Sequence, residues 1–210
     1  MENQDQRTVN SIQDLFSDSD FLNRQTVAWG QQEKIIYTTV AELKDSWAGG
    51  FSQKFTADIE RYQPDVVDFA NALSYCAATL GTVSNMYRKL EDEGTTMSAE
   101  EVESNTFNET DTGKSKTDVD DAFSPEQCKA KADQLITAAK TLPGIISEMD
   151  ESVERIARNY SSPNGTALIN ETKKMVHVVP DLVDELRKCA IFLVENVGPE
   201  YDRIHKTAAR

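Results

Sequence analysis

Apolar residues recur every three or four positions over most of the chain, which is the spacing of one face of an α-helix. The first run comprises Leu22, Trp29, Ile36, Val40 and Leu43, and the second comprises Phe51, Phe55, Ile59, Tyr62, Val66, Phe69, Leu73, Cys76, Leu80, Val83, Tyr87 and Leu90. A strand has a period of two and cannot produce this pattern. The pattern predicts a helical hairpin over residues 20–91, with a tight turn at Trp47-Ala48-Gly49 between the two runs.

A second hairpin is predicted over residues 124–204. Ser124-Pro125-Glu126-Gln127 is typical of a helix start, with Ser124 as N-cap and Gln127 as its capping-box partner. The apolar stripes that follow are again spaced by three and four, and they end before Gly198-Pro199, where we expect a kink or a stop. We assign the turn between them to the region of Tyr160, Asn164 and Gly165, because Pro, Asn and Gly cluster there.

The two hairpins resemble an internal duplication. Trp47 aligns with Tyr160 when the first helices are superimposed, and two Pro-Asp-aliphatic-Val-Asp runs each begin 15 residues after a turn glycine, Gly49 or Gly165. Since proline lacks the backbone N–H, each second helix is expected to bend, or to break into two, near Pro64 and Pro180. Pro143 is expected to kink the third helix.

Residues 92–123 between the hairpins predict a flexible acidic linker. Residues 91–121 carry eleven carboxylates against two lysines, and no helical stripe crosses them. Few large apolar groups are present to offset the entropy of ordering such a segment. Residues 1–19 are also polar and are treated as a separate N-terminal segment, which fits either a short helix packed on the bundle end, with Ile12, Leu15 and Phe16 on one face, or a loose segment. Residues 205–210 are treated as a tail.

The net charge of −14 argues against binding to nucleic acid or to anionic lipid, since either requires a basic face. No uninterrupted apolar run approaches the roughly 18 residues that span a bilayer, so we expect no membrane insertion. The first residues lack the basic and apolar regions of a cleaved leader, so any export is expected to be independent of the Sec route.

No catalytic, cofactor-binding or metal site is predicted. Cys76, Cys128 and Cys189 lie far apart on apolar stripes and are expected to be reduced core residues. Only His177 and His205 are available as imidazole ligands or bases, and neither has a ligand-like spacing from a cysteine.

A single hairpin leaves one side of its apolar stripe in water, so each hairpin needs a partner. The expected architecture is all-α, with two long hairpins packed antiparallel as an elongated four-helix bundle. Pairing within one chain and exchange of hairpins between two chains bury the same stripes, so a monomer and a domain-swapped dimer both fit.

The first hairpin resembles the WXG family of bacterial type VII secretion substrates, the early-secreted-antigen-like proteins. The resemblance rests on Trp47-Ala48-Gly49 at the turn and on Tyr87-Arg88-Lys89-Leu90-Glu91, a Tyr-x-x-x-acid signal at the end of the second helix. It covers residues 20–92. The second hairpin departs from the pattern, because Tyr160 replaces the tryptophan and Tyr201 is followed four positions on by His205 rather than by an acid.

The resemblance implies a non-enzymatic protein that a type VII system secretes, or a targeting partner for such a protein. In the family two hairpins pair antiparallel, commonly with the export signal of one beside the Trp-x-Gly turn of the other. Trp47, Gly49, Tyr87 and Glu91 would then form the recognition surface, and the partners would be the type VII ATPase, another WXG-like protein or a second copy. The alternative is an intracellular helical adaptor or chaperone that binds a partner helix.

Overall fold

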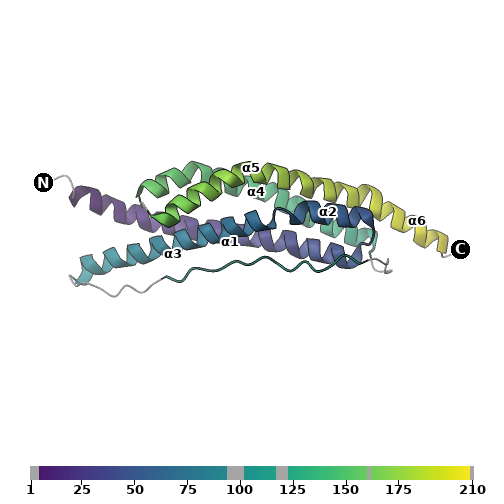
Figure 1. Cartoon of the computed structure of the whole chain (residues 1–210), viewed down its shortest axis with the longest axis horizontal. Helices are drawn as coiled ribbons and strands as arrows, with labels where there is room; N and C mark the ends of the chain where they lie inside the picture. The colour runs from purple at the N-terminus through teal and green to yellow at the C-terminus, as the bar shows by residue number, and fades with distance from the viewer. Residues whose placement is uncertain (1–4, 94–101, 117–122, 160–161, 209–210) are drawn as a thin grey trace. The chain divides into compact units, whose positions relative to one another are not determined.

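The computed structural model describes residues 5–93, 102–116, 123–159 and 162–208, and in these residues it is all-α with no strand (Figure 1). The all-α helical-bundle prediction is confirmed. The order of elements is α1 (Asp5–Ser46), α2 (Gly50–Glu60), α3 (Gln63–Glu93), α4 (Pro125–Asn159), α5 (Pro163–Phe192), a π-helical stretch η1 (Leu193–Val197) and α6 (Gly198–Ala208).

The chain forms two compact units, and each takes residues from both hairpins. Unit 1 consists of Met1–Gly30, Val67–Phe107 and Ile145–Val176, and unit 2 of Gln31–Val66, Asn108–Gly144 and His177–Arg210. Neither hairpin is a unit by itself. This follows from the amphipathic stripes, because each hairpin can bury its apolar side only against the other.

Four helical segments pack in unit 1. Trp29 of α1 meets Phe69 of α3 edge to face, with ring centroids 4.8 Å apart. Further along the same pair, Ser19 donates to the carbonyl of Ala77 over 3.1 Å. Residue numbers rise along α1 as they fall along α3, so these helices are antiparallel. Helix α1 is joined to α4 by Gln25 to Glu148 and by Asp18 to Arg155. Helix α5 is joined to α3 by Asn164 to Thr79 and to α4 by Lys173 to Glu154.

Unit 2 repeats this antiparallel pairing with other residues. The Thr39 hydroxyl lies 3.1 Å from the Gln134 amide oxygen, and Lys131 pairs with Glu42, which joins α1 to α4. Arg61 lies 3.8 Å from Glu185 and links the end of α2 to α5. The α4 helix begins as predicted: the Ser124 N–H donates to the Gln127 side chain over 2.8 Å, and the Gln127 N–H returns a bond to the Ser124 hydroxyl over 3.3 Å. The capping box is confirmed.

Of the two alternatives for residues 1–19, the described part is helical, but it continues directly into α1 instead of forming a separate short helix. It is helical from Asp5, and Leu15, Asp18 and Ser19 are all buried in unit 1. The carboxylate of Asp18, only 1% exposed, is satisfied by Arg155 and by a 3.0 Å bond from the Asn159 amide. Two of the polar residues in this stretch, Asp18 and Ser19, are therefore buried with hydrogen-bond partners.

The three prolines behave differently. The chain breaks between α2 and α3 at Arg61 and Tyr62, immediately before Pro64, so the second helix of the first hairpin divides in two. Pro64 then occupies the first turn of α3, where a missing N–H costs least. Pro143 and Pro180 instead lie inside the continuous helices α4 and α5.

The turn of the second hairpin was placed too late. Helix α5 begins at Pro163, and the Ser162 hydroxyl accepts the Gly165 N–H over 3.0 Å as an N-cap. Asn164 and Gly165 therefore belong to the first helical turn rather than to the loop. Serine before proline is the same start signal as at Ser124, and it outweighs the turn preference of Asn and Gly. Tyr160 lies outside the described residues.

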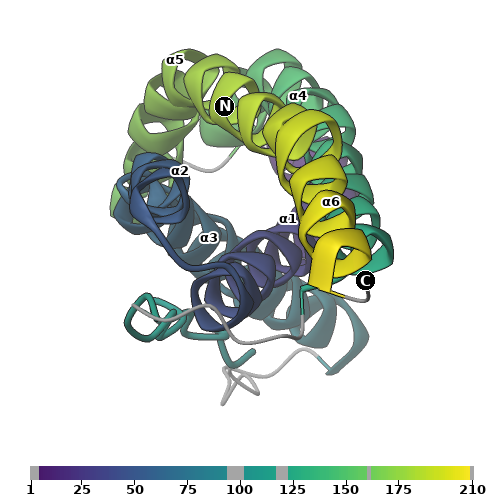
Figure 2. The ribbon, with the colours of Figure 1, turned by 90° about the vertical axis from the view of Figure 1, so that its right-hand side faces the viewer.

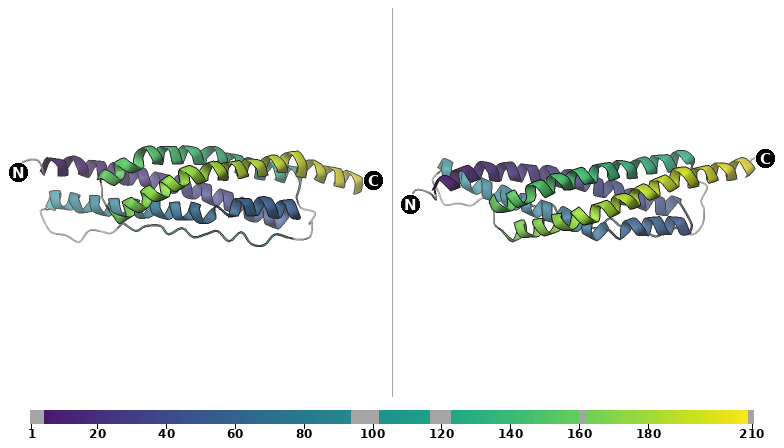
Figure 3. Two further views of the ribbon diagram at one scale, coloured as in Figure 1. Left: turned by 45° about the horizontal axis from the view of Figure 1, so that its top comes forward. Right: turned by 90° about the horizontal axis from the view of Figure 1, so that it is seen from above.

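Residues 102–116, the extended segment, differ from the flexible linker that composition predicted. Figures 1 and 3 show their extended course. In unit 1 residues 102–107 follow α3, and in unit 2 the Gln63 amide donates to the Thr110 carbonyl over 2.9 Å. The segment gains order by hydrogen bonding to helix side chains, which its own apolar content does not indicate. The remainder of the predicted linker, 94–101 and 117–122, lies outside the described residues.

One described helical stretch, Gly50–Leu90, is long and apolar enough to cross a membrane by length and composition, with a mean hydropathy of 1.2 in its most apolar window. The helix break at Arg61 and Tyr62 interrupts this stretch. In the structure 56% of the window is buried, as in a helix that packs in a protein core.

Candidate functional site

The turn between α1 and α2 is built around Gly49. The Trp47 N–H donates to the Leu43 carbonyl over 2.8 Å and closes the last turn of α1. Gly49 then adopts φ 107° and ψ 175°, a backbone conformation that side chains disfavour, and its carbonyl accepts the Gln53 N–H over 3.1 Å to start α2. The Trp-x-Gly spacing thus places a large ring and a chain reversal at the same point.

An aromatic cluster covers this turn. The rings of Trp47 and Phe55 are stacked with centroids 6.1 Å apart, and those of Trp47 and Phe192 with centroids 5.9 Å apart. Phe192 also lies 4.9 Å from Phe51 and 5.0 Å from Phe55. Phe192, the last residue of α5, is therefore the ring shared by the whole cluster. Trp47 is 8% exposed, whereas Phe51 at the edge of the cluster is 62% exposed.

The C-terminal helices reach the turn through a change of helical pitch. In η1 the Gly198 N–H donates to the carbonyl of Leu193, five residues back, and Pro199 offers no N–H to the next bond. Figure 2 shows α5 passing into α6 without a loop. The wider π turn shifts the face that α6 presents, so that half-buried Tyr201 and exposed Ile204 lie toward the Trp47 turn.

These elements enclose an open, mainly apolar hollow of about 430 Å³ in unit 2. This volume lies within the range of small-molecule pockets and also suits one or two protruding side chains of a partner. We call it the turn hollow. Its lining comprises residues 46–51 of the turn, Phe123, Phe192, Asn196, Val197, Glu200, Tyr201 and Ile204.

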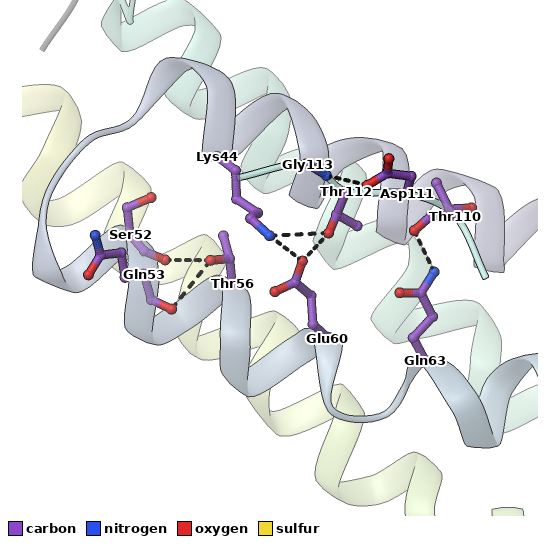
Figure 4. A network of polar contacts seen from close by, with 10 residues as sticks. All are labelled: Lys44, Ser52, Gln53, Thr56, Glu60, Gln63, Thr110, Asp111, Thr112 and Gly113. Carbon is purple, nitrogen blue, oxygen red and sulfur yellow. Dashed lines mark hydrogen bonds and ion pairs between the residues drawn. The ribbon is translucent and has the colours of Figure 1, made fainter. Parts of the chain in front are cut away.

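A buried ion pair holds the end of α1 against α2 (Figure 4). Lys44, 9% exposed, donates to the Glu60 carboxylate over 2.7 Å, and Thr112 of the extended segment bonds to both side chains. The Lys116 N–H also donates to the Lys44 carbonyl over 2.9 Å and so satisfies a group that a helix end leaves unpaired. The extended segment therefore braces the end of α1, the helix that leads into the Trp47 turn.

Charge at the hollow is confined to its rim. The Arg203 guanidinium donates to Glu200 over 3.0 Å and lowers the pKa of that carboxyl, although both side chains are exposed. Away from the hollow, burial raises the pKa of the Cys76 and Cys189 thiols to about 12 and that of Cys128 to about 11. All three thiols are free and buried, as expected of core cysteines.

The residues proposed for recognition do not all lie in one unit. Trp47 and Gly49 belong to unit 2 and line the turn hollow. Tyr87 and Glu91 lie near the end of α3 in unit 1, where Tyr87 is half-buried. Asn164 of unit 1 donates to the Thr79 hydroxyl over 2.7 Å, which is a bond between helices.

Phe192, Phe123 and Ile204 were missed as site residues. Tyr201 was recognised only as the degenerate counterpart of Tyr87, yet it is this tyrosine that lines the hollow beside Trp47. The predicted duplication was the signal that could have found it, because antiparallel pairing of two such hairpins would bring the tail of one to the turn of the other.

No protein-family model, curated protein or solved structure matches this chain. Among the described residues there is no group of three or more His, Cys, Asp or Glu side chains able to hold a metal ion. The turn hollow offers aromatic and aliphatic surface with a polar rim, an arrangement that binds side chains or small apolar molecules through contact and desolvation.

Proposed function

We propose that this protein is a non-enzymatic WXG-like protein that a bacterial type VII system secretes, or that targets another protein for such secretion. One observation carries the proposal. The Trp47-Ala48-Gly49 turn of the first hairpin lies beside Tyr201 and Phe192 from the last part of the second hairpin. The family resemblance implies this juxtaposition for two separate chains, and here a single chain supplies both sides.

In this proposal the recognition surface combines Trp47 and Gly49 with Tyr201. Tyr87 and Glu91 carry the better sequence match but belong to unit 1, so the proposal treats them as a second element. The binding partner is the type VII ATPase, and a further WXG-like protein or a second copy is the alternative partner.

Secretion from a Gram-positive host with and without its type VII ATPase tests the proposal. Wild-type export is expected to require the ATPase, and Tyr201→Ala, Tyr87→Ala and Trp47→Ala are each expected to reduce it while helicity is kept. Phe16→Ala is a matched control, because Phe16 is 42% exposed on α1 and belongs to neither proposed element. Unchanged export of all three test variants would contradict the proposal.

The second candidate is an intracellular adaptor that binds a partner helix. It is favoured by Phe51 and Ile204, which are 62% and 55% exposed at the turn hollow and would anchor an apolar helix face. Retention of the wild type in the cytosol of a secretion-competent host, together with a stable complex lost in Phe51→Ala, would favour this function over secretion.

A further inference from the structure

Side chains of α3 hold the backbone of the extended segment in unit 1. The N–H of Val102 donates to the Thr82 hydroxyl over 2.9 Å, and the N–H of Asn105 donates to the Ser74 hydroxyl over 2.7 Å. At Phe107 the Asn71 amide makes two bonds: its oxygen accepts the Phe107 N–H over 2.8 Å, and its nitrogen donates to the Phe107 carbonyl over 3.1 Å. This pattern recognises an extended backbone, which every peptide offers.

The spacing of these polar side chains matches an extended chain. From Thr82 to Asn71 is eleven residues of helix, or about 17 Å at 1.5 Å per residue. From Val102 to Phe107 is five residues of extended chain, also about 17 Å. The two lengths agree, so the first and last backbone bonds both form along α3.

Two glycines receive the apolar side chains of the segment. A Cβ at Gly30 of α1 would lie 2.8 Å from the Phe107 ring, so this ring approaches closer than any other residue type at position 30 allows. At Gly81 of α3 a Cβ would lie 3.1 Å from Val102. We call the face formed by Gly30, Asn71, Ser74, Gly81 and Thr82 the peptide groove.

The two side-chain positions of the groove differ in the space they leave. Val102 borders an open hollow of about 400 Å³ that is also lined by Tyr75, Val83 and Asn164. The Phe107 ring is instead held tightly at Gly30. A larger aliphatic residue therefore fits at the first position, whereas the second position is matched to a phenylalanine.

We propose that the peptide groove is a binding site for an extended segment of a partner protein, and that residues 102–107 occupy it within the chain. The occupant of the groove defines the chemistry of that partner: an extended segment with an aliphatic residue and, five positions later, a phenylalanine. Proline is excluded at the three positions whose N–H groups are bonded.

Exchange of occupants is feasible because the segment is held by few side chains. Between Val102 and Phe107, both half-buried, Glu103, Asn105 and Thr106 are exposed. The tethered segment nevertheless competes from within the same chain, where effective concentrations reach about millimolar. A partner segment must therefore bind the groove more tightly than residues 102–107 would as a free peptide. Substitutions that weaken the binding of residues 102–107 make the groove available.

The test is binding of a fluorescent peptide with the sequence of residues 102–110 to full-length protein, measured by anisotropy. Val102→Ala combined with Phe107→Ala in the protein is expected to raise its affinity for the peptide at least tenfold over the wild type. A peptide with leucine at the Val102 position is expected to bind at least as tightly, because the adjacent hollow has room for it. A peptide with alanine at the Phe107 position is expected to bind at least tenfold more weakly.

Two further substitutions distinguish groove binding from nonspecific contact. They are made in the protein that carries Val102→Ala and Phe107→Ala, which we call the freed protein. Asn71→Ala removes the backbone clamp, and Gly30→Leu fills the phenylalanine position; each is expected to reduce peptide affinity at least tenfold with unchanged helicity by circular dichroism. Equal affinity of wild type and freed protein, or indifference to the phenylalanine, would overturn the proposal. So would a strand-exchanged wild-type dimer by light scattering, since a second copy would then be the occupant. None of these outcomes depends on secretion, so this proposal and the proposed function fail separately.

Discussion

Phe192 stacks against Trp47 with ring centroids 5.9 Å apart and ring planes inclined by 29°. The contact joins the last residue of α5 to the residue that follows α1, although 145 positions separate them in the sequence (192 − 47). Because Phe51 and Phe55 also meet Phe192, this one ring determines how the turn and the C-terminal helices of unit 2 fit together.

Removing that ring should both destabilise unit 2 and expose Trp47. We expect Phe192→Ala to cost about 2 kcal/mol, less than the 3–5 kcal/mol typical of a fully buried phenylalanine, because Phe192 is only half-buried. In a Trp29→Phe background, Trp47 is the sole tryptophan, and its emission should shift to longer wavelength. Ile191→Ala, at a neighbouring residue that is 52% exposed, is the control and should leave the emission unchanged.

The backbone at Gly49 gives a prediction that depends on conformation alone. Nothing lies within 4 Å of a Cβ at either Gly49 or Gly50, but only Gly49 has a positive φ. Gly49→Ala should therefore lower the free energy of unfolding by about 1–2 kcal/mol through backbone strain. Gly50→Ala should be neutral or slightly stabilising, since Gly50 is in α2. Urea denaturation of the two variants measures the difference, and equal losses would contradict the assigned turn.

Gly30 and Gly144 form a second matched pair, in which space rather than conformation differs. A Cβ at Gly30 would meet the Phe107 ring at 2.8 Å, whereas Gly144 has open space. Gly30→Ala should displace Phe107, and hydrogen exchange at the amides of residues 102–107 should become faster. Gly144→Ala should stabilise α4 by up to about 1 kcal/mol and leave that exchange unchanged. Protection of the segment that persists in Gly30→Ala would show that the ring does not anchor it.

The carboxylate of Asp18 depends on partners from α4. Asp18 is 1% exposed and pairs with Arg155, so Arg155→Ala leaves a buried charge with only the Asn159 bond. We expect a loss of about 1–3 kcal/mol in the free energy of unfolding. Arg24→Ala removes a solvent-exposed pair with Asp20 within α1 and should cost less than about 0.5 kcal/mol. Thermal denaturation of both variants compares the two ion pairs.

The buried thiols predict how stability depends on pH. Burial raises the pKa of Cys76 and Cys189 to about 12, above the value of about 8.5 expected in the unfolded chain. As pH rises between these values, the unfolded state loses thiol protons while the folded state keeps them, so the free energy of unfolding falls. Below pH 8 the thiols make no such contribution.

Replacing Cys76 and Cys189 with alanine should flatten the decline in stability above pH 9 as measured by urea denaturation, although the truncations also lower stability at every pH. In the wild type, alkylation of the thiols at pH 8 should follow global unfolding, and rapid alkylation in the folded protein would contradict the observed burial.

The helical pattern was predictable because it depends on spacing alone. The Trp47-Ala48-Gly49 turn and the Ser124 capping box are local signals, and both were confirmed. Most of the apolar stripe residues from Leu22 onward are buried, although Phe51 and Leu90 at the ends of the second stripe are exposed. Local signals also conflicted: Ser162-Pro163 starts a helix where Asn164 and Gly165 predicted a turn, and a helix capped by a bonded serine is the more stable choice. Pro64 breaks its helix and Pro180 does not, which their shared flanking sequence does not distinguish.

Only part of the candidate site, the turn itself, could be predicted from the sequence. Trp47 and Gly49 were identified from the turn, whereas Phe192 lies far away in the sequence and is one apolar residue among many on α5. The extended segment was missed for a related reason. Its order comes from Asn71, Ser74 and Thr82, whose polar side chains are indistinguishable in sequence from solvated ones until a backbone is placed against them.

The sequence by itself determined the class of structure, the two hairpins, the first turn and the reduced cysteine core, because apolar periodicity, glycine and capping residues act within a few positions of the chain. Only the tertiary structure decided that each compact unit draws on both hairpins, that Tyr201 and Phe192 lie beside Trp47 in unit 2, and that residues 102–116 follow the helices. These features depend on contacts between distant residues, for which local periodicity carries no signal and packing and hydrogen-bond satisfaction decide the outcome.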